Sequence, residues 1–69
     1  MSPQQFRVWM ERVFSLIPES GANFGAIVKE AAKGDETGYA RGDAKAALLA
    51  LKAEGRITIA DDGTVKKGR

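Results

Sequence analysis

The side chains in this chain that could do chemistry are hydroxyls, carboxylates and cations, because its 69 residues include no cysteine and no histidine. The commonest metal ligands are therefore missing, as is the base that usually activates a serine or threonine. We expect no catalytic site, no metal site and no cofactor, and an enzyme is not predicted. The chemistry that remains is electrostatic, namely the binding of anions by lysine and arginine.

Lysine and arginine are concentrated in the second half of the chain. The net charge is +2; residues 1–40 contribute −1, with four basic and five acidic side chains, and residues 41–69 contribute +3, with seven basic and four acidic. A difference of this size also occurs by ordinary variation. It nevertheless makes the C-terminal half the better candidate for a surface that binds a polyanion.

Three helices are predicted from the spacing of apolar residues and from their end signals. The first has a capping-box pattern at Ser2 and ends before Pro18, the second has Asn23 at its N-cap, and Gly55 stops the third. The predicted ranges are about 3–17, about 24–33 and about 41–54. We expect Tyr39, in the last connection, to pack onto the core.

A β-hairpin over about 56–67 is predicted to follow the third helix, because Ile57 and Ile59 alternate with polar residues before a turn signal. Residues opposite each other in a hairpin share a face, so Ile59 should pair with Val65. The loop is then residues 61–63, with Gly63 in a left-handed conformation. The predicted fold class is α+β, mainly helical, with a three-helix bundle followed by a hairpin.

The segment "TGYARGDAKAALLALKAEGRI", residues 37–57, resembles the second half of a winged helix-turn-helix domain of GntR-type and related regulators. There a "TGLS" turn leads into a recognition helix, which ends in "AL..L..EG.I" and is followed by a hairpin wing. The resemblance implies a single winged-helix domain over 1–69 that binds double-stranded DNA, a role in transcription regulation, and a cytoplasmic, nucleoid-associated location. Tyr39 and Ala40 depart from the usual aliphatic residue and serine, and Asp43 is unusual near the start of a DNA-reading helix.

The third helix is predicted to present an apolar outward face between two charged flanks. Successive residues are about 100° apart, so the core-facing set Ala44, Ala47, Leu48 and Leu51 leaves Gly42, Ala46, Leu49 and Ala53 pointing outward. One flank then carries Arg41, Lys45 and Lys52, and the other carries Asp43 and Glu54.

If this helix enters the major groove, the cations contact phosphates, and Arg41 in the first turn donates two hydrogen bonds to guanine. Among the outward residues, Ala46 or Leu49 would contact thymine methyl groups. The predicted DNA-binding residues are Arg41, Lys45 and Lys52 on the helix and Arg56, Lys66, Lys67 and Arg69 on the hairpin, with apolar contacts from Gly42, Ala46 and Leu49.

Two other interpretations of the outward face remain. It could bind a protein, making the chain an adaptor such as a polymerase- or replication-binding module, or it could be an alanine-rich surface without a partner. A homodimer through the apolar edge of the first helix, at Val8 and Leu16, is a further expectation.

Membrane and small-molecule partners are not expected. The most apolar stretch, residues 6–17, contains three charged residues and is too short to span a bilayer. The glycine-bearing segment 34–43 lacks the Gly-Lys-Ser/Thr ending of a phosphate-binding loop.

Overall fold

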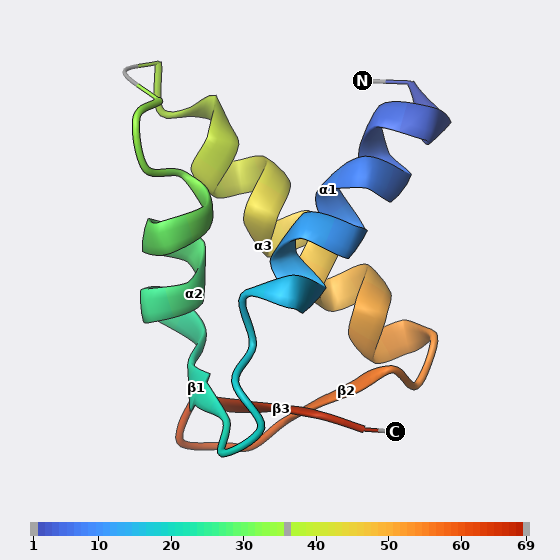
Figure 1. Ribbon diagram of the computed structural model, residues 1–69, viewed down its shortest axis with the longest axis vertical. Coiled ribbons are helices and arrows are strands. Elements are labelled where there is room, and N and C mark those ends of the chain that lie inside the picture. Colours follow the sequence, from blue (N-terminus) through green and yellow to red (C-terminus); the bar gives the residue numbers. More distant parts are fainter. Residues whose placement is uncertain (1, 36, 69) are drawn as a thin grey trace.

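A computed structural model of the chain describes residues 2–35 and 37–68 (Figure 1). Within them, three helices precede a C-terminal hairpin, and a short strand from the first connection joins the hairpin in one sheet. The elements are α1 (Pro3–Ser15), β1 (Ala22–Asn23), α2 (Phe24–Ala31), α3 (Tyr39–Ala53), β2 (Ile57–Ile59) and β3 (Thr64–Lys67). The predicted α+β class, with three helices followed by a hairpin, is confirmed.

Helix α1 begins with the predicted capping box. The Ser2 hydroxyl accepts the Gln5 amide hydrogen at 3.2 Å, and the Gln5 side chain accepts the Ser2 amide hydrogen at 3.4 Å. The helix ends at Ser15, earlier than predicted, because the next amides, including that of Ile17, bond to carbonyls three residues back. Ile17 is still buried, so the apolar pattern continued beyond the helix itself.

Strand β1 was not predicted from the sequence. Its two residues pair with β3, Ala22 opposite Val65 and Asn23 opposite Thr64, and the Phe24 amide donates to the Gly63 carbonyl at 2.7 Å. The Asn23 side chain also caps α2, as predicted, by accepting the Gly25 amide hydrogen at 2.9 Å. The start of α2 is therefore hydrogen-bonded to the hairpin.

The bounds of α2 and α3 differ from the predicted ones. Helix α2 ends at Ala31, two residues early, and a turn leads to Gly34. Helix α3 begins two residues early, at Tyr39, and ends at Ala53. The prediction that Tyr39 packs onto the core is wrong, because its side chain is 78% exposed. One helical step rotates a side chain by about 100°, and the neighbouring Ala40 takes the buried position.

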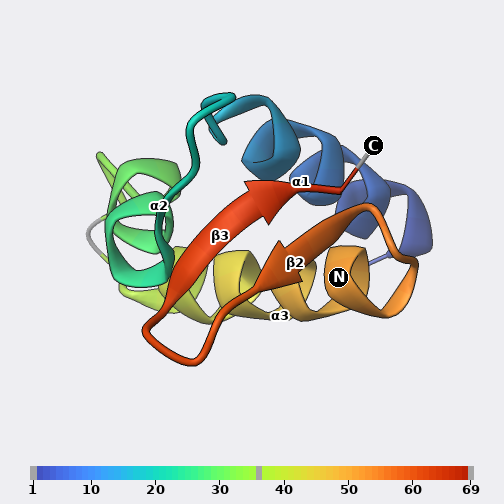
Figure 2. The same cartoon turned by 90° about the horizontal axis from the view of Figure 1, so that it is seen from below.

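The hairpin has the predicted register. Ile59 pairs with Val65, and the Ala60 amide donates to the Thr64 carbonyl at 2.9 Å, which leaves residues 61–63 as the loop. Gly63 has φ of 90°, the left-handed conformation expected at this place. The sheet is antiparallel in the order β1-β3-β2, and it crosses beneath α1 and α3 (Figure 2).

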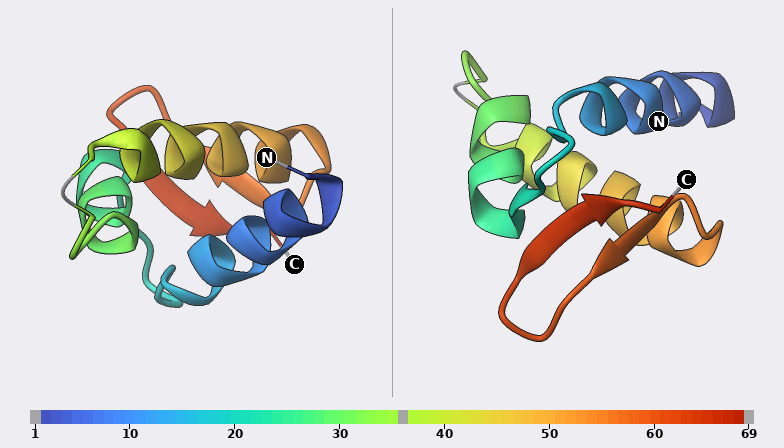
Figure 3. Two further views of the ribbon diagram at one scale, coloured as in Figure 1. Left: turned by 90° about the horizontal axis from the view of Figure 1, so that it is seen from above. Right: turned by 60° about the horizontal axis from the view of Figure 1, so that its bottom comes forward.

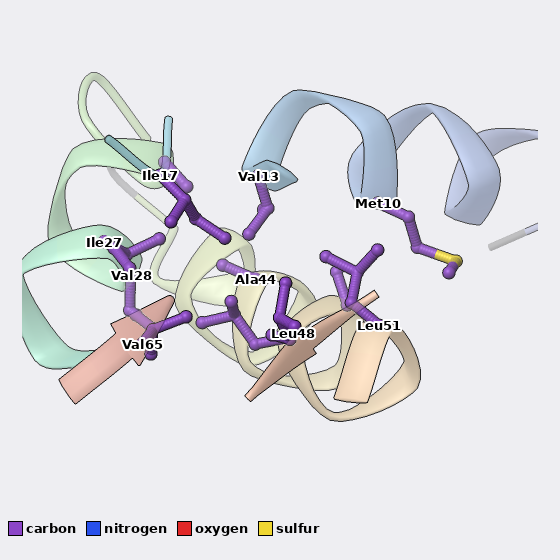
Figure 4. Close-up of a cluster of buried hydrophobic side chains, with 12 residues drawn as sticks. Met10, Val13, Ile17, Ile27, Val28, Ala44, Leu48, Leu51 and Val65 are labelled. Carbon is purple, nitrogen blue, oxygen red and sulfur yellow. The ribbon is translucent and has the colours of Figure 1, made fainter. Parts of the chain in front are cut away.

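The core lies between the three helices and the inner face of the hairpin (Figure 4). The four residues of α3 predicted to face inward are all 0% exposed, so the predicted orientation of this helix about its axis is confirmed. The other buried core side chains come from α1 and the turn after it, from α2 and from the two hairpin strands: Met10, Val13, Ile17, Ile27, Val28, Ala31, Ile57 and Val65.

Two adjacent leucines test this orientation. We expect Leu48→Ala to lower the free energy of unfolding by about 2–5 kcal/mol, because it leaves a cavity in the core. Leu49→Ala removes the same atoms from a side chain that is 57% exposed, and it should change the free energy of unfolding by no more than about 0.5 kcal/mol. Urea unfolding followed by circular dichroism measures both, and equal losses would contradict the orientation.

Candidate nucleic-acid interface

Helix α3 has one face that no other described element covers. The outward face of α3, defined by Gly42, Ala46, Leu49 and Ala53, is exposed at every position. Helix α1 and the hairpin lie on other sides of α3 (Figure 3). The face is apolar, and Leu49 is its largest side chain.

The acidic flank of α3 lies against α1. Glu54 forms an ion pair with Arg7 at 3.6 Å. Asp43 is half-buried and lines a hollow of about 420 Å³ between the two helices, together with Gln5, Val8, Trp9 and Arg12. The carboxylate of Asp43, a residue that is unusual near the start of a DNA-reading helix, is therefore directed toward α1 and away from the basic flank.

The basic flank lies on the opposite side of α3. Arg41, Lys45 and Lys52 are all exposed and follow one line along the helix, about 16 Å from first to last at 1.5 Å per residue. Arg41 and Lys45 also line a groove of about 380 Å³ between α2 and α3. We call this the α2–α3 groove.

The α2–α3 groove gains a third cation, Lys29, that the sequence analysis did not select. The described residues that line it are Gly25, Val28, Lys29, Arg41 and Lys45, and none of them is acidic. Lys29 is in the last turn of α2, and its nearness to Arg41 depends on how α2 packs against α3. No local spacing in the sequence signals that pairing.

The hairpin lysines lie on opposite faces of the sheet, because consecutive residues of a strand alternate. Lys66 is exposed on the outer face, opposite Thr58. Its side chain lies so close to Gly21 that a Cβ added there would be 2.8 Å from the Lys66 Cγ. Lys67 is half-buried on the inner face, so only Lys66 is presented outward.

Arg56, directly before β2, joins the hairpin to α1. Its guanidinium donates to both carboxylate oxygens of Glu11, at 2.6 and 3.3 Å, and lies 4.4 Å from the centre of the Phe14 ring. The Lys67 ammonium lies 5.0 Å from the same ring. The hydrogen bonds to Arg56 lower the pKa of Glu11 and raise that of Arg56. Both cations thus hold the hairpin in place and lie apart from the basic flank; Arg69 lies outside the described residues.

Asp35 caps the start of α3, the helix turn that contains Arg41. Its carboxylate accepts hydrogen bonds from the Thr37 hydroxyl at 2.7 Å, the Thr37 amide at 3.1 Å and the Ala40 amide at 2.7 Å. It takes the place of a capping side chain at Gly38, which has none. These hydrogen bonds lower the pKa of Asp35, and the bond from the Thr37 hydroxyl has the largest effect.

The described residues contain no group of three or more histidine, cysteine, aspartate or glutamate side chains arranged to hold a metal ion. Over the same residues, no helix combines the length and apolar character needed to cross a membrane.

Comparisons with protein-family models, with curated proteins and with solved structures found no match to this chain. The function is therefore inferred from the geometry of α3 and its neighbours.

Protonation of Asp35 provides a test of the α3 cap. Because its folded pKa lies below the ordinary value of about 3.9, the carboxylate stabilises the fold above that pH, and this contribution disappears as the pH falls through the folded pKa. At neutral pH we expect Asp35→Asn to lower Tm by a few degrees. The difference from the unmodified chain should shrink in acid.

Thermal unfolding of both proteins over a pH series measures this difference. Glu11, whose pKa is also lowered, is present in both proteins and cancels in the comparison. A Tm difference that stays constant throughout the acid range would contradict the role of the Asp35 carboxylate.

Proposed function

We propose that this chain is a small winged-helix module that binds double-stranded DNA, as a transcriptional regulator, with α3 in the major groove and the hairpin against the backbone. The order of three helices and a hairpin agrees with the resemblance of residues 37–57 to winged-helix regulators. The major groove, about 12 Å wide, admits a helix of about 10–12 Å diameter.

The observation that carries the proposal is the separation of charge around the outward face of α3. The acidic flank is turned toward α1, where Arg7 pairs with Glu54. The basic flank is exposed, and Lys29 from α2 extends it. A polyanion can therefore approach the outward face along its basic side without facing the two carboxylates of α3.

The cations then have distinct roles. Lys29 and Lys45 contact phosphates from the α2–α3 groove, and Lys52 contacts the backbone further along α3. Arg41, in the first turn, donates to a guanine edge or to a phosphate. Lys66 extends the phosphate contacts from the outer face of the sheet.

The hairpin loop projects past α3 on the side away from α1 (Figure 2). Its tip carries Asp61 and Asp62, which a DNA backbone would repel, so contact comes from Lys66 and not from the tip. Arg56 and Lys67 act indirectly, since they hold the hairpin against α1 through Glu11 and Phe14.

A second copy would raise the affinity of so small a module, whose DNA interface is expected to bury only about 600–1,000 Å². Val8 on α1 is 67% exposed, and Trp9 beside it is half-buried. This part of α1 is the surface we propose for contact between copies bound to adjacent half-sites.

The second candidate function is a winged-helix adaptor that binds another protein through the outward face of α3. The observation that favours it is the 57% exposure of Leu49, because protein interfaces bury such apolar side chains. The adaptor would not require the cations of the basic flank.

A salt titration distinguishes the two functions. Binding to a labelled random-sequence duplex, followed by fluorescence anisotropy, should weaken steeply with salt, because each phosphate contact releases counterions. Lys29→Gln and Lys45→Gln should each reduce the slope of log K against log salt by about 0.9.

The matched control is Lys33→Gln. Lys33 is as exposed as Lys29 and one turn later in the chain, but it lines a hollow on the α1 side with Trp9 and Asp35. Its replacement should leave the slope unchanged. Absence of salt-dependent duplex binding, or an equal effect of all three variants, would contradict the proposal, and loss of a protein partner in Leu49→Glu alone would favour the adaptor.

A further inference from the structure

The outward face of α3 has almost no means of recognising bases by hydrogen bonding. All four of its side chains are apolar or absent; the cations of the basic flank border it on one side, and on the other the carboxylates of Asp43 and Glu54 are directed toward α1. Sequence-specific recognition in the major groove usually employs Asn, Gln, Arg or carboxylate side chains against base edges. Here only Arg41, at one end of the helix, is suited to that task.

Leu49 is the feature of this face that needs an explanation. It is one of three large apolar side chains exposed among the described residues, with Val8 and Tyr39. The fold does not need it, because Leu48 and Leu51 supply the buried contacts of this part of α3. The small Ala46 and Ala53 beside it would let the helix backbone approach a partner closely.

The charges next to Leu49 indicate what covers it. Arg41, Lys45 and Lys52 run along the same helix within a quarter turn of the outward face, so a polyanion is the complementary partner. In the major groove of duplex DNA, the apolar group displayed at the base edges is the thymine methyl.

We infer that Leu49, assisted by Ala46, recognises thymine methyl groups, so that this chain selects its DNA sites by apolar contact more than by hydrogen bonding. The inference depends on the proposed DNA binding and names what the outward face recognises. Phosphate contacts from the basic flank set the depth and register of α3, and Leu49 then distinguishes thymine from the other bases.

The test compares two duplexes that differ in the methyl group alone. A short alternating A·T duplex and its counterpart with deoxyuridine present the same hydrogen-bonding edges and the same phosphates. We expect weaker binding to the deoxyuridine duplex, by roughly fourfold for each methyl buried. The salt dependence should be equal for both duplexes, because the phosphate contacts do not change.

Three variants assign the effect to its residue. Leu49→Ala, which leaves the core intact, should bring the thymine-to-uracil affinity ratio close to one while keeping the salt slope. Lys45→Gln should reduce the slope and keep the ratio. Lys33→Gln, at an exposed position that does not line the α2–α3 groove, should keep both.

The outcomes separate this inference from the proposed function. Salt-dependent binding with equal affinity for the two duplexes would overturn thymine recognition and leave DNA binding intact. A ratio that persists in Leu49→Ala would overturn the role of Leu49. Absence of binding to either duplex would overturn the inference together with the proposed function.

Discussion

The arrangement of this molecule depends on the burial of one side of α3. Ala44, Ala47, Leu48 and Leu51 are completely enclosed by α1, α2 and the hairpin, and removing such apolar area from water is the main favourable contribution to folding. Once these residues are buried, the helical repeat determines the direction of every other side chain on α3. The position of Leu49 and the separation of the two charged flanks are therefore consequences of core packing.

The three neighbours of α3 divide the charges among them. Helix α1 faces the acidic flank and supplies Arg7 to it, whereas α2 adds Lys29 to the basic flank. The hairpin uses Arg56 to pair with Glu11 of α1, which removes that cation from any interface. A net charge of only +2 thus understates how basic one side of α3 is, since its carboxylates lie on the other side.

Signals confined to a few neighbouring residues predicted much of the fold: the Ser2 cap, the core-facing leucines of α3 and the Ile59–Val65 register were all correct. What was missed depends on partners distant in the sequence. Strand β1 exists only because β3 pairs with it, and Lys29 joins Arg41 only through helix packing. The separation of Lys66 from Lys67 was, by contrast, available from strand alternation, and the wrong placement of Tyr39 came from treating the first turn of α3 as a loop.

The hydrogen bond between the Phe24 amide and the Gly63 carbonyl ties the hairpin to α2 at one end, while Arg56 and Glu11 tie it to α1 at the other. Because the hairpin is bonded to a helix at both ends, it is held in a fixed orientation relative to α1 and α2. The position of the hairpin relative to the α2–α3 groove is therefore set by these contacts within the chain. For the proposed DNA binding, such preorganisation avoids the conformational entropy that a flexible hairpin would lose when it binds.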